Sequence, residues 1–250
     1  MFYEITFSPT GGTKKSADLL STAWNEKTEI DLMKRQDDFA KYTFTAEDVC
    51  LVAVPSFSGR VPATATDRLK MMQGGGAKTI LVVVYGNRAY EDTFVDLEDT
   101  LKDRGFVPVG GAAVVAEHSI FREFAAGRPD ADDEIQLKDW SSRIKSKLEA
   151  GTERDMPFVG NRPYKKYGAI PMTPKAKTCQ MCGKCVSVCP VGAIPADKPN
   201  ETDAEKCITC MACVATCPMQ ARSVNPVALA GAKAMLKKAL SGRKENELFL

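Results

Sequence analysis

The sequence predicts an α/β fold with a parallel sheet for residues 1–150, followed by a small cysteine-rich α+β module. Three observations carry this prediction. Strand-like apolar runs alternate with helix-like stretches, Gly- and Ser/Thr-rich loops follow the strands, and eight of the nine cysteines lie within 39 residues near the C-terminus. Such alternation is typical of a parallel sheet covered by helices on both faces. At 250 residues the chain can hold this domain and a second, smaller one.

Five segments are predicted to be strands. Residues 2–7 alternate between apolar and polar side chains, and Ile30 and Leu32 mark a short second strand. Continuous apolar runs, as expected of strands buried on both faces, occupy residues 48–54 and 79–85. The fifth strand is marked by Val107, Val109, Val114 and Val115. The first domain is therefore expected to contain a five-stranded parallel sheet.

Three helices are predicted to cover this sheet, over residues 13–24, 88–104 and 130–150. The last two each end before a glycine, which is a common stop signal. The second also places apolar side chains at helical spacing, namely Phe94, Leu97 and Leu101.

Two copies of one cysteine pattern lie 28 residues apart. Each reads C-x2-C-x2-C-x3-C-P, in residues 179–190 and 207–218. This run supplies thiolates to cubane iron–sulfur clusters. A zinc site rarely uses four cysteines at this spacing twice, and a disulfide framework would suit a secreted chain, which residues 1–20 do not indicate. The pattern therefore predicts two [4Fe-4S] clusters.

This segment resembles bacterial ferredoxins that carry two [4Fe-4S] clusters, and so implies a ferredoxin-like domain. In that pattern, three cysteines of one copy and the last cysteine of the other copy bind each cluster. The resemblance implies that the first cluster is held by Cys179, Cys182, Cys185 and Cys217. It implies that the second cluster is held by Cys207, Cys210, Cys213 and Cys189. The ninth cysteine, Cys50, lies inside a predicted buried strand and is expected to be a core residue.

Three loops that follow predicted strands carry candidate binding residues. Ligands of parallel sheets lie beyond the carboxyl ends of the strands. After the first strand, S-P-T-G-G-T offers hydroxyls and glycine amides at a helix N-terminus, which suits a phosphate. The same residues could merely form a turn and a helix cap, and the P-loop motif is absent. Residues 55–62 and 85–92 each offer backbone donors, a glycine and an aromatic ring.

Taken together, the chain resembles a family of flavodoxin–ferredoxin fusion proteins. The resemblance rests on the cysteine pattern and on S-P-T-G-G-T, P-S-F-S-G-R-V-P, Y-G-N-R-A-Y-E-D and A-E-H-S. It implies a flavodoxin-like domain that binds FMN, with the phosphate on Ser8, Thr10, Gly11, Gly12 and Thr13. The flavin ring would lie between the later loops, with candidate contacts Ser56, Phe57, Ser58, Gly59, Arg60, Tyr85, Gly86, Asn87, Arg88, Tyr90, Asp92 and His118. Phe57 occupies a position where the resemblance leads us to expect a tyrosine. Phenylalanine can still stack on the flavin ring, but it lacks the hydroxyl.

Several of these side chains also have ordinary structural interpretations. Phe57 and Tyr90 could anchor their loops, and Arg60 could be a solvated charge. His118, the only histidine, could donate to the flavin or titrate near neutrality, or it could be a hydrogen-bonding loop residue. No catalytic triad, paired-carboxylate site or nicotinamide-binding motif is visible, so no catalytic residue is predicted.

The remaining segments are a connector and a tail. Residues 151–178 are predicted to be a proline-rich connector, and its aromatic side chains indicate that it lies extended along the first domain. Residues 179–225 form the predicted ferredoxin-like domain. Residues 226–250 are expected to form an amphipathic helix, over 226–240, and a tail. We expect this helix to pack on the protein rather than on a membrane surface.

Charge and hydropathy restrict the class of protein. The formal net charge is +2, which does not favour nucleic acid as a partner, and no stretch of 18 apolar residues predicts a membrane span. Residues 175–250 hold 11 Lys and Arg against 6 Asp and Glu. That excess of 5 positive charges is expected to offset the negative charge of two clusters.

These features together predict an electron-transfer flavo-iron–sulfur protein. It would be cytoplasmic, would suit an anaerobic or microaerobic cell, and would work with redox protein partners. One alternative is a flavin-dependent reductase of a small molecule that is fed by the clusters. Another is a cluster-bearing redox sensor or binding module without FMN. Whether the chain is an enzyme, and whether it forms homo-oligomers, stays open at this point.

Overall fold

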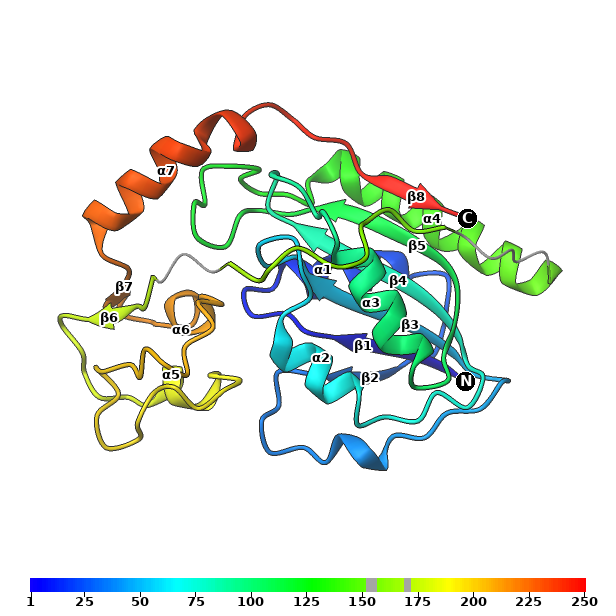
Figure 1. The fold of residues 1–250 in the computed structure, drawn as a ribbon, viewed down its shortest axis with the longest axis horizontal. Coiled ribbons are helices and arrows are strands. Elements are labelled where there is room, and N and C mark those ends of the chain that lie inside the picture. The colour runs from blue at the N-terminus through cyan, green and yellow to red at the C-terminus, as the bar shows by residue number, and fades with distance from the viewer. Residues whose placement is uncertain (152–156, 169–171) are drawn as a thin grey trace.

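The computed structural model describes residues 1–151, 157–168 and 172–250. Residues 152–156 and 169–171, which belong to the predicted connector, lie outside the described residues. The chain forms a layered α/β domain with a smaller cysteine-rich module at one side, and both termini lie away from that module (Figure 1).

A six-stranded sheet forms the centre of the α/β domain, in the order β2-β1-β3-β4-β5-β8. The strands are β1 (Phe2–Thr6), β2 (Thr28–Asp31), β3 (Val49–Pro55), β4 (Lys78–Tyr85), β5 (Val107–Val115) and β8 (Glu247–Phe249). The first five are parallel, and their order is that of flavodoxin-like folds. The predicted fold class is therefore confirmed. The sheet also has a sixth, antiparallel strand that was not predicted, because the C-terminal tail returns to pair with β5.

Helices cover both faces of the sheet. One face carries α1 (Gly12–Leu20) and α4 (Ala131–Ala150), and the other carries α2 (Ala63–Leu69) and α3 (Thr93–Lys102). A short 3-10 helix, η1 (Phe39–Lys41), precedes β3.

Strand β4 shows why its sequence is an unbroken apolar run. Ile80, Val82 and Val84 pack with α1 and α4, whereas Leu81 and Val83 pack on the opposite face. Cys50 in β3 is fully buried in the second of these layers, which confirms that it is a core residue.

Two helices are shorter than predicted, and α2 was not predicted at all. Helix α1 ends at Leu20, and Trp24 instead stacks on Phe2 with ring centroids 4.2 Å apart. Helix α3 begins at Thr93 rather than at residue 88. Asn87 and Glu91 have φ of 61° and 42°, and this left-handed backbone cannot continue a right-handed helix.

The described part of the connector lies along the α/β domain. Phe158 stacks on Phe94 of α3, with ring centroids 5.1 Å apart. Asp92 accepts hydrogen bonds from the backbone N–H groups of Asn161 and Lys165. These contacts fix residues 157–168 against α3 and the loop before it.

The cysteine-rich module is built from short elements. They are β6 (Lys175–Ala176), α5 (Lys184–Ser187), α6 (Ala212–Ala215) and β7 (Arg222–Ser223), with β6 antiparallel to β7. Because β6 lies inside the predicted connector, the module begins before Cys179. Helix α7 (Pro226–Leu240) has the predicted bounds, and its N-cap Asn225 accepts from two backbone N–H groups.

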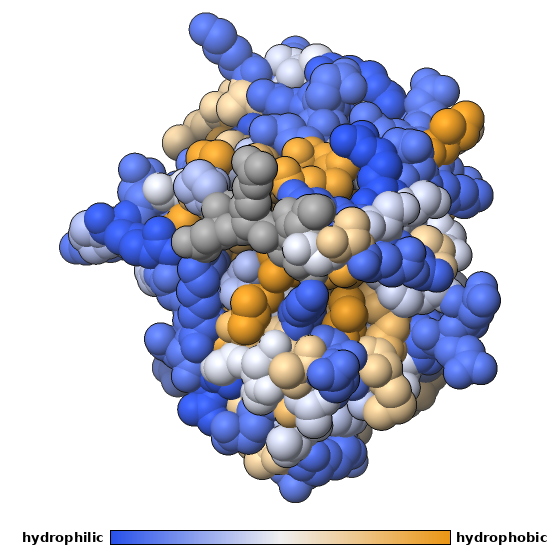
Figure 2. All heavy atoms as spheres, turned by 90° about the vertical axis from the view of Figure 1, so that its right-hand side faces the viewer, coloured by the Kyte–Doolittle hydropathy of each residue, from blue (hydrophilic) through white to orange (hydrophobic). Residues whose placement is uncertain are grey.

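Helix α7 packs on the protein through few side chains. Ala232 and Leu240 are its buried residues, and they contact Phe121 and Met172. No helix among the described residues is long and apolar enough to cross a membrane. On the side that faces away from the module, hydrophobic patches are scattered among hydrophilic side chains (Figure 2).

Candidate functional site

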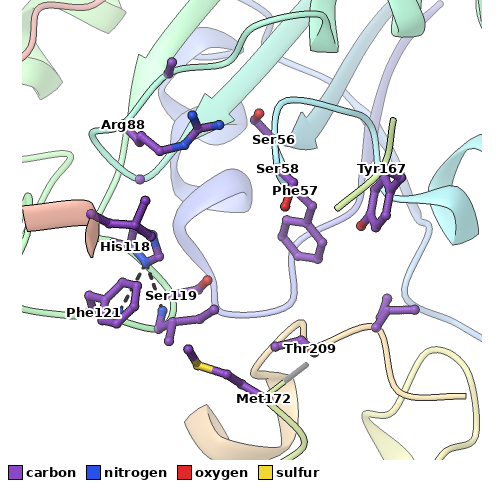
Figure 3. A pocket seen from close by; sticks show the side chains of 15 residues that line it. Ser56, Phe57, Ser58, Arg88, His118, Ser119, Phe121, Tyr167, Met172 and Thr209 are labelled. Atoms are coloured by element: carbon purple, nitrogen blue, oxygen red, sulfur yellow. Dashed lines mark hydrogen bonds between the residues drawn. The ribbon is translucent and has the colours of Figure 1, made fainter. Parts of the chain in front are cut away.

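Loops from the carboxyl ends of β1, β3, β4 and β5 meet and bound two neighbouring cavities of about 140 and 70 Å³. The cavities share Ser56, Phe57, Gly86, His118 and Ser119. Figure 3 shows the side chains around the larger cavity, where the connector and the cysteine-rich module close it with Tyr167, Met172 and Thr209. The site therefore lies where a parallel sheet of this order binds its ligands.

The loop between β1 and α1 presents a helix N-terminus to the smaller cavity. Thr10, Gly12 and Thr13 line this cavity, and Gly11 at the start of the helix has a φ of 91°. Ser8 Oγ accepts a hydrogen bond from the backbone N–H of Lys14. The Lys14 ammonium pairs with carboxylates of other residues, so the donors left for an anion are backbone N–H groups and hydroxyls.

His118 lies at the boundary between the two cavities. Its Nδ1 accepts from the backbone N–H groups of Ile120 and Phe121, at 3.1 and 3.2 Å. Burial lowers the pKa of His118 to about 4, which favours a neutral ring at physiological pH over the interpretation that it titrates near neutrality. With Nδ1 occupied as an acceptor, the neutral ring carries its proton on Nε2.

Gly86 permits the close approach of His118 to the loop after β4. A Cβ at Gly86 would lie 2.8 Å from the His118 ring and 2.9 Å from its Cα. Because backbone and ring would both have to move, only glycine fits here without a shift of His118.

The structure brings most of the predicted flavin contacts together. The predicted residues that line one or both cavities are Thr10, Gly12, Thr13, Ser56, Phe57, Ser58, Tyr85, Gly86, Arg88 and His118. The predicted residues outside both linings are Ser8, Gly11, Gly59, Arg60, Asn87, Tyr90 and Asp92.

Four of the latter side chains have partners elsewhere. Arg60 Nε donates to Asp96 at 2.8 Å, and Asp92 holds the connector. Asn87 Nδ2 donates to the carbonyl of Leu240, and the Tyr90 hydroxyl lies 3.1 Å from Glu247 Oε1. These loop residues bind the connector and the C-terminal tail instead of facing the cavities.

Four cysteine thiols line a separate cavity inside the module, namely those of Cys189, Cys207, Cys210 and Cys213. This is the set that the resemblance implies for the second cluster, including the crossover of Cys189 to the other copy of the pattern. Ala193 N–H donates to Cys189 Sγ at 3.2 Å. Hydrogen bonds to sulfur of this kind stabilise thiolate ligands.

The arrangement of these thiols suits a cluster better than a single zinc ion. Among the described residues, no three cysteine sulfurs lie within 4.8 Å of one another. Sulfurs around a tetrahedral zinc ion with 2.3 Å bonds would be about 3.8 Å apart. All nine cysteines are free thiols, which contradicts a disulfide framework. The described thiols therefore do not have the close spacing of a tetrahedral zinc site.

The other four cysteines are more exposed. Cys182 is exposed, Cys179 and Cys217 are half-buried, and Cys185 is buried. Ala221 N–H donates to Cys217 Sγ at 3.3 Å, which repeats the bond from Ala193 to Cys189 in the other copy of the motif. That these four thiols share one cluster stays a prediction.

Arg222 is a buried cation between the two groups of cysteines, and no sequence motif indicates it. Its side chain donates to the carbonyls of Pro199 and Glu201, and its Nε is buried without a partner among the described residues. Burial raises the pKa of Cys185 and Cys213, although the Arg222 charge opposes this. At Cys217, hydrogen bonds from backbone N–H groups, together with the Arg222 charge, outweigh burial and lower the pKa. A partly unsatisfied cation among thiols fits an anionic group held by those thiols.

The thiol-lined cavity adjoins the cavities of the α/β domain. Cys210 lines both the cavity of the four thiols and the smaller cavity beside the β1–α1 loop. Ile208 and Thr209, which flank it, line the larger cavity. Ile208 and Thr209 were not predicted as site residues, because only the tertiary fold brings them to the sheet.

Comparisons with known proteins give one family match. Residues 172–218 match the family described as a 4Fe-4S dicluster domain. No curated protein matches the chain at a significant level.

Solved structures similar to this chain include several flavodoxins. One from Streptococcus pneumonia TIGR4 has 16% identity, covers 59% of this chain and 99% of its own, and has a TM-score of 0.42. Oxidised flavodoxin 1 from Bacillus cereus has 16% identity, covers 58% and 97%, and has a TM-score of 0.41. Fusobacterium nucleatum flavodoxin bound to flavin mononucleotide has 13% identity, covers 58% and 98%, and has a TM-score of 0.40. The fold assignment rests on the strand order and not on these scores.

Proposed function

We propose that this chain, which joins a flavodoxin-like domain to a ferredoxin-type module, is an electron-transfer protein that binds FMN and two [4Fe-4S] clusters. The observation that carries the proposal is the position of Cys210. This one residue lines the thiol cavity and also the cavity bounded by the loops of the α/β domain. A cluster bound by Cys210 would therefore lie next to a ligand bound at those loops.

The chemistry of the loops suits FMN. Thr10, Gly12 and Thr13 would hold the phosphate at the N-terminus of α1. Phe57 would contact the ring, and His118 would offer its Nε2–H as a donor that stays neutral at physiological pH. Because Gly86 has no side chain, His118 can lie close to the loop after β4, in space that a Cβ at Gly86 would occupy.

The thiols fit two cubane clusters. Cys189, Cys207, Cys210 and Cys213 would hold the inner cluster, and Cys179, Cys182, Cys185 and Cys217 would hold the outer one. The chemistry that FMN and such clusters supply when bound is transfer of electrons in pairs and singly. The protein orients the groups, excludes water around the inner thiols and keeps the outer thiols near the surface. We therefore infer a redox protein partner that meets the module at the outer thiols.

Free thiolate ligands favour a reducing compartment, so we place the protein in the cytoplasm. Oxygen-sensitive clusters would suit an anaerobic or microaerobic cell.

A reductive titration without oxygen tests this function. The wild-type protein is expected to take up about four electrons per chain, two for FMN and one for each cluster. Cys210→Ser is expected to lose the inner cluster and take up about three, with FMN retained. Cys50→Ala, a cysteine of the sheet core, should titrate like the wild type. Uptake of only two electrons, with no bound flavin, would favour the sensor or binding module.

A further inference from the structure

Two arginines of the α/β domain lie against one turn of the module. Arg68 of α2 donates from Nη2 to the carbonyl of Pro190 at 2.6 Å. A Cβ at Gly192, two residues further, would clash with Arg35 Nη1. This turn begins at Cys189, whose sulfur accepts from the N–H of Ala193. Both cations therefore meet the module at the turn that follows Cys189, one of the predicted ligands of the inner cluster.

Arg68 is buried without a carboxylate partner. It is 8% exposed, and its guanidinium donates to the carbonyls of Leu32 and Pro190. Among the described residues, no carboxylate forms an ion pair with it. Asp31 and Asp67 lie near enough to favour its charged form, but burial outweighs them and lowers the pKa of Arg68. An arginine nevertheless stays protonated in proteins, so the interface contains a buried charge.

Such a charge is costly unless something of opposite sign compensates it. Carbonyl oxygens compensate it only in part. Four thiolates around an oxidised cubane core would carry a net charge of about −2. Pro190, which accepts from Arg68, directly follows Cys189, one of the four thiols that would hold this anionic cluster.

We propose that Arg68, with Arg35 beside it, is the counter-cation of this inner cluster and raises its reduction potential. The inference rests on the proposed function, because it requires the four thiols to hold a cluster. An added electron makes the cluster more negative, so a nearby fixed positive charge favours the reduced form. The outer cluster, whose thiols lie nearer the surface, would feel this charge less.

A purely structural role for Arg68 would have a different signature. It would affect the stability of the domain interface but not the potential of one cluster in protein that remains folded. Arg68→Gln removes the positive charge, whereas Arg68→Lys keeps the charge and loses the planar guanidinium with its paired N–H donors. Arg35→Gln removes an exposed charge and leaves the buried contacts intact. Arg104→Gln is the matched control, because Arg104 also bonds a main-chain carbonyl, that of Met72 in its own domain.

The experiment is a potentiometric titration of the cluster-loaded full chain, followed by paramagnetic resonance. Arg68→Gln is expected to shift one of the two clusters to a more negative potential and to leave the other near its wild-type value. Arg35→Gln should give a smaller shift of the same sign, which keeps the test valid if Arg68→Gln does not fold. Arg68→Lys should restore most of the wild-type potential, and Arg104→Gln should titrate like the wild type.

Two failures are distinguishable. Wild-type protein without iron would contradict the proposed function itself. Clusters that are present, but whose potentials are the same in Arg68→Gln, Arg35→Gln and the wild type, would contradict only the role of the two arginines.

Discussion

The guanidinium of Arg222 lies 3.7 Å from the thiol of Cys185, measured from Nη1 to Sγ. Arg222 is 3% exposed and comes from β7, whereas Cys185 comes from α5, so this contact joins the second half of the module to the first. The same guanidinium holds the segment between the two cysteine motifs through the carbonyls of Pro199 and Glu201. Arg222 thus combines packing of the module with a positive charge among its thiols.

Arg222→Gln is therefore expected to weaken the module and its clusters together. It leaves buried carbonyls unpaired and removes a cation from the thiols, with an expected loss of about 2–4 kcal/mol in unfolding free energy. Iron per chain after anaerobic reconstitution and chemical denaturation measure the two effects. Arg104→Gln serves as the control here as well. Full iron loading and unchanged denaturation in Arg222→Gln would contradict this role.

His118 makes the stability of the domain depend on pH. Its pKa of about 4 in the folded state lies below the ordinary value of about 6.5. The unfolded chain therefore binds a proton that the folded chain refuses, so stability is full above pH 6.5 and is lost as the pH falls toward 4. The expected loss is up to about 3 kcal/mol.

His118→Asn isolates this contribution, because its oxygen can replace Nδ1 as the acceptor and does not titrate. Denaturation of the flavin-free protein between pH 7 and 4 should show a shallower loss of stability in the variant. Equal slopes for the two proteins would mean that His118 binds its proton over the same pH range in the folded and unfolded states, so that its pKa is not lowered.

Asp92 is expected to hold the connector in place. It is buried, and it accepts from the main chain of Asn161 and Lys165 and from the Asn161 side chain. Asp92→Ala should cost about 2–4 kcal/mol and make residues 157–168 sensitive to limited proteolysis. Asp103→Ala, at an exposed position just after α3, should change neither the unfolding free energy nor the rate of proteolysis. A connector equally resistant in both variants would show that its other contacts suffice.

Gly86→Ala is expected to lower FMN affinity at least tenfold. The new Cβ would meet both the ring and the backbone of His118, so the loops that bound the cavities would have to move apart. Gly231→Ala in α7 is the control, because a Cβ there meets nothing within 4 Å. The control should bind FMN normally and gain about 0.5–1 kcal/mol of stability. Equal flavin affinities in the two variants would place FMN elsewhere.

The sequence predicts the centre of the sheet well because residues 48–54 and 79–85 are continuous apolar runs, which have few other interpretations. The resemblance to two-cluster ferredoxins also implies the set of four cysteines around Cys210, and these four line one cavity. The sequence does not predict β8, because residues 247–249 form a strand only through pairing with β5.

For the same reason, the sequence alone does not predict the protein partners of loop residues that are predicted to contact the flavin. Asn87 and Tyr90 have suitable chemistry, but their partners are Leu240 and Glu247, which lie about 150 residues away in the sequence. Arg68 and Arg222 carry no motif, and only the tertiary fold brings them to the cysteines. Local sequence patterns indicate where the cluster and flavin sites lie. Contacts between residues far apart in the sequence determine which other side chains lie next to those sites.

The most direct test of the account is the cofactor content of protein purified without oxygen. We predict about eight irons, eight sulfides and one FMN per chain, because two cubane sites and one flavin site are expected. Iron and sulfide at that level with no flavin, even after reconstitution, would contradict the claim that the cavities beside Cys210 hold FMN.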